Sequence, residues 1–197
     1  MNRLKPQEIA RACAALPEHA IIHTDPLNDA MERFFILDTE RRVAAFLATV
    51  AVESAYLSAT EENLNYRSAE RLVKIYPRAF KTVEQAQPYT RNPEGLSQKL
   101  YAGYHGRGLI ALTWRENYER AGDALGYDYV GAPALVTQPK HAALTAAWFW
   151  HEHGCNELAD DGDMDEITRR VNGPARLHLD ERTKLAKNAL GWLYEVA

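Results

Sequence analysis

The segment that most constrains the fold lies between Thr39 and Ser54, where three charged residues are followed by a run of small and apolar side chains. On a helix drawn over this range the apolar residues fall on several sides, and a helix that is apolar nearly all round has to be buried. The longest mostly apolar stretch, Val43 to Val52, is too short to span a bilayer. We therefore expect residues 39–54 to form the central helix of a globular core.

Helix signals recur along the rest of the chain, whereas strand signals are scarce. We expect a first helix near Pro6, which suits a first helical turn, and a second after Thr24-Asp25-Pro26 that carries Met31, Phe34 and Phe35. Further helices are expected over residues 68–76, up to 101, over 139–153, from 163 to about 172 and over 179–194, and residues 55–67 fit a short strand or an irregular loop. The pattern predicts a mainly α fold with little or no β structure.

The length and composition of the chain are those of a small globular protein. A chain of 197 residues favours one domain, or one with a small lobe, and 46% hydrophobic with 25% charged residues is ordinary for a globular protein. The net charge of −4 argues against a nucleic-acid partner bound through a positive field. No apolar stretch follows Met1, so we expect no secretory signal. Cys13 and Cys155 are too few for a disulfide framework, and whether they pair is left open.

Three carboxylates stand out at the end of the central helix and just after it. Glu53 follows an apolar stretch, where a carboxylate is costly unless it is paired, hydrogen-bonded or protonated. It fits a surface glutamate, a partner of a nearby arginine, or a general acid. Glu61 and Glu62 follow in the polar segment and fit either a solvated acidic edge or a second catalytic carboxylate. Two carboxylates facing one cleft are the minimal equipment for glycoside hydrolysis, since one protonates the leaving oxygen while the other activates water.

Five stretches of the sequence resemble glycoside hydrolase family 19. They are Phe46–Ser54, Thr60–Tyr66, Gly106–Tyr118, Ala147–Trp150 and Ile167–Gly173. The first two are similar to the patterns F-L-A-x-x-A-H-E-S and E-N-L-N-Y of the family's bacterial and phage lysozyme-like branch, which is related to class I chitinases. The stretches follow one another in the same order as in the family and cover roughly residues 40 to 190. Together they indicate the family much more specifically than any one stretch does alone.

The resemblance implies a two-lobed, lysozyme-like helical fold with a substrate cleft, formed by residues 1–197 as one catalytic domain without a separate wall-binding module. It implies Glu53 as the general acid and Glu62 as the general base, with the carboxyl groups about 6.5–9.5 Å apart, as an inverting displacement requires. Glu61 is the weaker candidate for the base, because the family's glutamate directly precedes Asn63.

The resemblance also implies residues that contact the sugar. Thr113 and Asn117 fall where the family holds a sugar or the catalytic water, and Asn172 falls on another asparagine of the cleft. Arg107 either supports the acid by its charge or forms a structural ion pair. The remaining candidates, which either line the cleft or fix the loop through side-chain-to-backbone bonds, are Asn63, Asn65 and Tyr66.

The sequence departs from the family pattern at three places. Val52 stands where the family usually has histidine, and Ala111 replaces the usual glutamine of the sugar-binding stretch. The segment between Tyr101 and Gly106 is shorter than in many relatives. These departures weaken the assignment of individual sugar subsites but leave both carboxylates in place.

Two other features have more than one interpretation. Lys74, Arg78, Lys81 and Arg91 form a basic region that fits an anionic polymer such as peptidoglycan, a membrane surface, or an ordinary solvated helix face. Trp114 follows Thr113 next to the expected cleft, where it either stacks on a pyranose ring or packs as part of the cleft wall.

No metal site or cofactor is expected. His151, Glu152, His153 and Cys155 lie close together in the sequence, but the histidines are two residues apart and do not share a helix face, so the spacing is not that of H-E-x-x-H. An acid, a base and water suffice for the expected reaction.

We expect a peptidoglycan-degrading endolysin that hydrolyses β-1,4 bonds between N-acetylated amino sugars and serves host lysis. Its expected partners are peptidoglycan glycan strands, with no nucleic acid, no stable membrane insertion and a monomeric state. It would be made in the host cytoplasm and act on the periplasmic wall after release. The alternatives are a chitinase or interbacterial wall-degrading effector of the same family, or a non-catalytic glycan-binding module.

Overall fold

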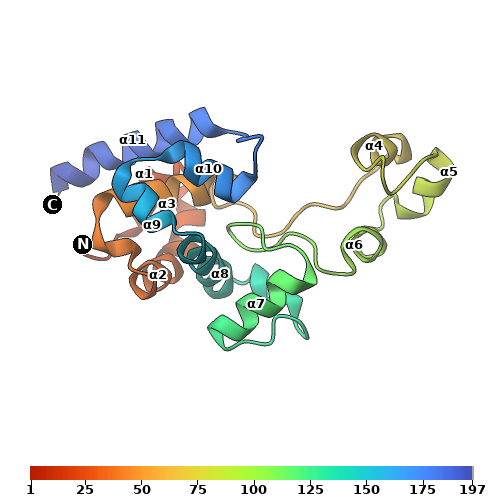
Figure 1. The fold of residues 1–197 in the computed structure, drawn as a ribbon, viewed down its shortest axis with the longest axis horizontal. Helices are drawn as coiled ribbons and strands as arrows, with labels where there is room; N and C mark the ends of the chain where they lie inside the picture. Colours follow the sequence, from red (N-terminus) through yellow and green to blue (C-terminus); the bar gives the residue numbers. More distant parts are fainter. Residues whose placement is uncertain (197) are drawn as a thin grey trace. The chain divides into compact units, whose positions relative to one another are not determined.

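A computed structural model describes residues 1–196, with side chains as far as residue 193, and most of this range is helical (Figure 1). The chain divides into two compact units. Unit 1 combines Met1–Thr60, Arg107–Ala111 and the chain from Ala134 onward, and unit 2 combines Glu61–Gly106 with Leu112–Pro133. The mainly α fold is confirmed, since residues 1–196 hold eleven α-helices and no strand longer than one bridge residue. That residues 1–197 act as a single catalytic domain stays a prediction.

The predicted central helix is α3, Glu40–Glu53, which begins and ends one residue inside the predicted range. Thr39 caps it, because its Oγ1 accepts a hydrogen bond from the backbone N–H of Arg42 at 3.2 Å. Every residue from Val43 to Ala51 is buried. In unit 1, α3 contacts α1 (Pro6–Cys13), α9 (Cys155–Asp161) and α11 (Leu179–Val196), among other elements (Figure 1). Burial on all sides explains why Thr49 is the only polar residue between Val43 and Ala51.

The predicted start of the second helix at Thr24-Asp25-Pro26 is wrong. The helix α2 spans Pro17–Arg33 and contains Pro26, while Phe34 ends it and Phe35 has a left-handed backbone with φ of 59°. A proline inside a helix costs about 3 kcal/mol or more, because it removes one backbone hydrogen bond. The buried face of α2 packs against α8 (Pro139–Glu152), and this apolar contact outweighs the missing bond.

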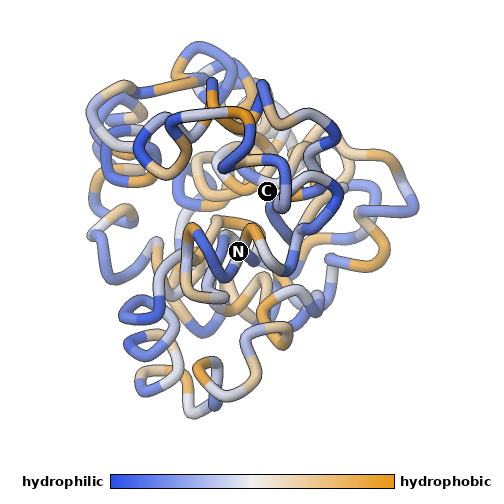
Figure 2. Tube along the Cα trace, turned by 90° about the vertical axis from the view of Figure 1, so that its right-hand side faces the viewer, coloured by the Kyte–Doolittle hydropathy of each residue, from blue (hydrophilic) through white to orange (hydrophobic). Residues whose placement is uncertain are grey.

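The remaining elements of unit 1 follow the predicted ranges with one addition. The helix α10, Met164–Asn172, begins where Asp163 Oδ1 accepts from the backbone N–H of Glu166 at 2.9 Å. The helix α9 was not predicted; it follows directly on Gly154, whose φ of 60° makes the turn after α8. Two short 3₁₀ helices, η1 (Ile36–Asp38) and η3 (Pro133–Thr137), complete the set. Hydrophobic and hydrophilic residues alternate along the helical coils, as expected of amphipathic helices (Figure 2).

Unit 2 is built from shorter helices around a smaller core. They are α4 (Ala69–Ile75), α5 (Val83–Ala86), the 3₁₀ helix η2 (Gln87–Tyr89), α6 (Pro93–Tyr101) and α7 (Arg115–Leu125). The buried cluster consists of Leu64, Ala69, Leu72, Phe80, Ala86 and Leu96. The predicted helices near 68–76 and up to 101 are confirmed as α4 and α6. The helix α7 was not predicted, although Tyr118, Ala121 and Leu125 lie buried at helical spacing. Among residues 1–196, none of the helices is long and apolar enough to cross a membrane.

Candidate active site

Glu53 is the last residue of α3, and its side chain is 16% exposed. Its Oε1 accepts a hydrogen bond from Nη2 of Arg182, a fully buried residue of α11. Arg182 Nη1 also donates to the carbonyl of Thr49, one turn earlier in α3, at 3.5 Å. Of the alternatives for Glu53, the structure thus selects an arginine-paired carboxylate. This pairing leaves a catalytic role open, because an ion pair at a helix end holds a carboxylate in one orientation.

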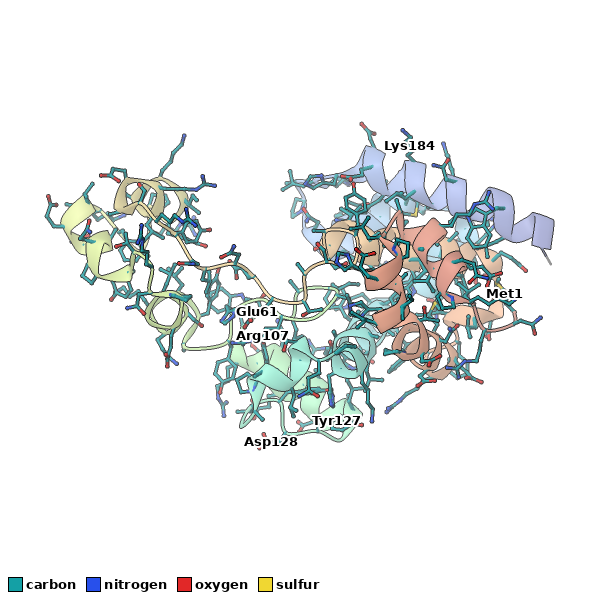
Figure 3. The ribbon with its side chains drawn as sticks, turned by 180° about the vertical axis from the view of Figure 1, so that it is seen from behind. Met1, Glu61, Arg107, Tyr127, Asp128 and Lys184 are labelled. Atoms are coloured by element: carbon teal, nitrogen blue, oxygen red, sulfur yellow. The ribbon has the colours of Figure 1, made fainter. Side chains whose placement is uncertain are left out.

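Sequence reasoning missed Arg182, although its position carries a signal. Ala186, Ala189 and Leu193 follow it at helical spacing and are buried, so a cation stands in the apolar stripe of α11. Lys184, two residues further along the same helix, points away from unit 1, as is usual for a cation (Figure 3). A buried charge in an apolar stripe requires a partner of opposite charge, and Glu53 supplies it.

Glu62 in unit 2 is held by three donors. The hydroxyl groups of Tyr101 and Tyr76 donate to Oε1 at 3.1 and 3.4 Å, and the backbone N–H of Gly106 donates to Oε2 at 3.3 Å. The backbone N–H of Glu62 donates in turn to the carbonyl of Gly106 at 2.8 Å. Tyr66, one of the predicted cleft residues, joins the cluster because its hydroxyl lies 3.3 Å from that of Tyr76. The carboxylate is therefore oriented by the backbone of Gly106, by Tyr101 at the end of α6 and by Tyr76, the residue after α4.

Tyr76 and Tyr101 keep their protons at neutral pH. Burial, together with the negative charge of Glu62, raises the pKa of Tyr101 to about 12. Burial and the hydrogen bond with Tyr66 also raise the pKa of Tyr76 well above its ordinary value. Both phenols consequently remain hydrogen-bond donors to the carboxylate over the whole range in which a hydrolase works.

Glu61, the weaker candidate for the base, has a different partner. Its Oε1 lies 2.8 Å from Nε2 of His105, whose Nδ1 lies 2.6 Å from Oγ of Ser97. His105 and Ser97 are buried, while the Glu61 side chain is 49% exposed. The two neighbouring glutamates therefore belong to separate networks: Glu61 to a histidine and a serine, and Glu62 to the tyrosines.

The other predicted site residues of unit 2 have local partners. The side-chain amide of Asn117 donates to the carbonyl of Thr113 at 2.8 Å, so these two positions are adjacent. Trp114 between them is 54% exposed, and its ring centroid lies 5.2 Å from that of Tyr101. For Asn63 the structure confirms the loop-fixing role, because its Oδ1 accepts from the backbone N–H of Asn65 at 2.9 Å. Unit 2 thus brings Glu62, the tyrosines and an exposed tryptophan into one connected group.

Two predicted residues lie in unit 1 with Glu53. Asn172 is the last residue of α10, and its Oδ1 accepts from the backbone N–H of Leu177 at 3.2 Å. In the part of the chain that the structure describes, no hydrogen bond joins Asn172 to Glu53. Arg107 is 7% exposed, and it belongs to the short return of the chain through unit 1.

A comparison with known protein families shows which family the chain belongs to. Residues 36–159 match the family model described as chitinase class I, glycoside hydrolase family 19. The chain belongs to glycoside hydrolase family 19. The matched range contains both Glu53 and Glu62. This family-19 protein is accordingly a glycoside hydrolase of the chitinase-like kind, and its class of substrate is chitin or a related glycan polysaccharide.

Individual relatives agree with this membership. A "Glycosyl hydrolase family 19 domain-containing protein" of Haemophilus influenzae is 33% identical over 156 residues, which cover 72% of this chain and 75% of that protein. Endochitinase EP3 of Arabidopsis thaliana is 36% identical over 114 residues, 57% of this chain but only 35% of the plant protein. The crystal structure of chitinase C from Streptomyces griseus superimposes with a TM-score of 0.64 and 25% identity, covering 95% of this chain and 76% of that one.

Proposed function

We propose that this family-19 hydrolase degrades peptidoglycan by cleaving β-1,4 bonds between N-acetylated amino sugars, with Glu53 as the general acid and Glu62 as the general base. The observation that carries the proposal is the pair of anchored carboxylates. Glu53 is held by a buried arginine, and Glu62 accepts hydrogen bonds from two tyrosines and a backbone N–H. Both occupy the positions at which the family's motifs place the catalytic acids.

The reaction is a single displacement with inversion. Protonated Glu53 gives its proton to the glycosidic oxygen as the bond from that oxygen to the anomeric carbon breaks. Glu62 takes a proton from a water molecule, whose oxygen attacks the anomeric carbon from the opposite face. At the end Glu53 is ionised and Glu62 is protonated, and exchange with solvent restores both. Acid, base and water account for every atom, so this scheme needs no cofactor.

Two features support peptidoglycan as the polymer. The stretch Glu62–Tyr66 carries the E-N-L-N-Y pattern of the lysozyme-like branch. Between residues 67 and 101 the chain has seven lysines and arginines against three acidic residues, in a protein whose net charge is −4. Peptidoglycan is anionic through its peptide carboxylates, whereas chitin is neutral, so a local positive region favours the former.

For the biological setting we propose an endolysin that serves host lysis as a monomer. In this proposal the protein is made in the host cytoplasm and reaches the periplasmic wall after the inner membrane is breached. A bacterial wall-degrading effector of the same family would use the same chemistry on the same polymer.

Chitin hydrolysis is the second candidate, and it is favoured by the likeness to chitinase C of Streptomyces griseus. One experiment separates the two. Turbidity loss of outer-membrane-permeabilised Gram-negative cells and hydrolysis of chitin hexasaccharide are measured with wild type and with Glu53→Gln. We expect lysis by wild type, with a loss of at least about a hundredfold in the variant. Binding to the wall without lysis would instead point to a glycan-binding module.

A further inference from the structure

Unit 2 has a shallow cavity of about 550 Å³, which we call the hollow. It is lined by residues 75–79 at the end of α4 and by Lys99 and Leu100 near the end of α6. Its apolar lining comes from Ile75, Pro77, Ala79 and Leu100, and Arg78 and Lys99 add two positive charges. The cavity therefore combines an apolar floor with cations, which suits a ligand that carries small alkyl groups beside an anion.

Both cations are available to a ligand. Arg78 and Lys99 are exposed, and neither forms an ion pair within the described part of the chain. The same holds for the other lysines and arginines between residues 67 and 101, but only these two line the hollow.

Tyr76 connects the hollow to the reacting centre. It lines the cavity, and its hydroxyl donates to Oε1 of Glu62, the base of the proposed mechanism. A group bound in the hollow is thus one tyrosine side chain away from the carboxylate that activates water. This proximity makes the hollow a candidate substrate subsite.

We propose that the hollow is a subsite for the peptide stem of peptidoglycan, with Arg78 and Lys99 binding stem carboxylates and the apolar floor receiving alanine methyl groups. The proposal rests on the function proposed above and deepens it, because it identifies what distinguishes peptidoglycan from chitin. Chitin strands carry neither carboxylates nor methyl-bearing peptides, so they gain nothing from these two cations. Arg78 and Lys99 are in this view specificity-determining residues.

A binding experiment tests the subsite without any turnover. Muramyl tripeptide contains no β-1,4 bond, so it can be titrated into the wild-type protein while the methyl signals of Ile75, Ala79 and Leu100 are followed by NMR. We expect saturable shifts that weaken as sodium chloride is raised from 20 to 200 mM, because salt screens the charges. N-acetylglucosamine should leave these methyl signals unshifted.

Paired variants make the test specific. In Arg78→Gln with Lys99→Gln we expect the Kd for muramyl tripeptide to rise about tenfold, since two exposed ion pairs are removed. Arg71→Gln with Lys74→Gln removes the same charge from exposed residues of α4 outside the hollow, and its Kd should stay within about twofold. An equal effect of both pairs, or no shift in wild type, overturns the subsite. Equally tight binding of N-acetylmuramic acid overturns its assignment to the peptide stem.

Kinetics separate this inference from the proposed function. In Arg78→Gln with Lys99→Gln, kcat/KM on Gram-negative sacculi should fall about tenfold, while hydrolysis of chitin hexasaccharide stays within twofold of wild type. A matching loss on both substrates would contradict the specificity role. If wild type cleaves neither polymer, the proposed function fails, and the NMR titration still decides whether the hollow binds a peptide stem.

Discussion

Arg182 donates a hydrogen bond from Nη2 to Oε1 of Glu53, and this ion pair ties α11 to the end of α3 inside unit 1. The guanidinium is fully buried, and its Nε has no hydrogen-bond partner among the described residues. A buried cation with one orphaned N–H is costly, so its place in the apolar stripe of α11 is better explained by what it does to Glu53 than by stability alone.

We expect Arg182→Met to lower kcat more than tenfold while KM changes less than threefold, because the acid loses the group that orients it. Steady-state kinetics on sacculi measure both parameters, and Arg182→Lys should recover part of kcat. Circular dichroism checks that the helices persist in both variants. A rise in KM with unchanged kcat would mean that Arg182 supports the binding surface and leaves the acid unaffected.

Glu62→Gln should reduce kcat by about a hundredfold or more, because an amide cannot take a proton from water. The neighbouring glutamate is the matched control. Glu61→Gln alters the contact with His105 and leaves the three donors to Glu62 in place, so its kcat should stay within about threefold of wild type. If the two variants exchange these behaviours, Glu61 is the base and the motif assignment is off by one residue.

Tyr101→Phe should lower kcat about tenfold with little change in KM, since it removes a hydrogen bond of 3.1 Å to a charged carboxylate. Tyr104→Phe is the control, because the Tyr104 hydroxyl donates to the carbonyl of Val130 at 3.2 Å and does not touch Glu62. Initial rates for both variants on one batch of sacculi make the comparison. Equal losses in the two variants would show a general packing effect.

We expect the two buried cysteines to make the folded protein less stable at alkaline pH. Burial raises the pKa of the Cys13 and Cys155 thiols to about 12 each, against about 8.5 in an unfolded chain. Between these values the folded state keeps protons that the unfolded state releases, so the free energy of unfolding falls as the pH rises through this window. Urea denaturation at pH 8 and pH 10.5 measures the slope.

A double variant isolates the thiol contribution. Cys13→Ala with Cys155→Ala should have a smaller difference in unfolding free energy between the two pH values than wild type. Both cysteines are free and buried, so a thiol reagent at pH 8 should label neither in the folded protein and both after denaturation. Rapid labelling of the native protein would contradict the burial on which the pH dependence depends.

Local sequence signals predicted much of the helical skeleton. Thr39, Ser68 and Asp163 each begin a predicted helix range, and each caps the helix that starts one residue later, because a side-chain oxygen meets a free backbone N–H there. The error at Pro26 arose because local rules ignore tertiary packing, and the burial of α2 against α8 overrides the proline. The helix α7 escaped prediction because its start at Trp114, with φ of 76°, has no side-chain cap.

The sequence predicted the two carboxylates of the candidate site but not the residues that hold them in place. The motifs pointed to Glu53 and Glu62 as residues, but not to the groups that hold them. Arg182 lies 129 positions beyond Glu53, and Tyr101 lies 39 beyond Glu62. Such partners are brought together by the packing of whole helices, which no local pattern encodes. A polar residue inside an apolar stripe, as at Arg182, is the one signal of this kind that a sequence offers.

The central claim is that Glu53 and Glu62 carry out one inverting displacement on a β-1,4 bond. Proton NMR of the newly formed reducing end, recorded within minutes of mixing enzyme and a soluble glycan oligomer, tests it most directly. We predict that the α-anomer appears first and mutarotates to the equilibrium mixture, with no product from Glu53→Gln or Glu62→Gln. First appearance of the β-anomer, or α-product formed at the wild-type rate by either variant, would contradict the claim.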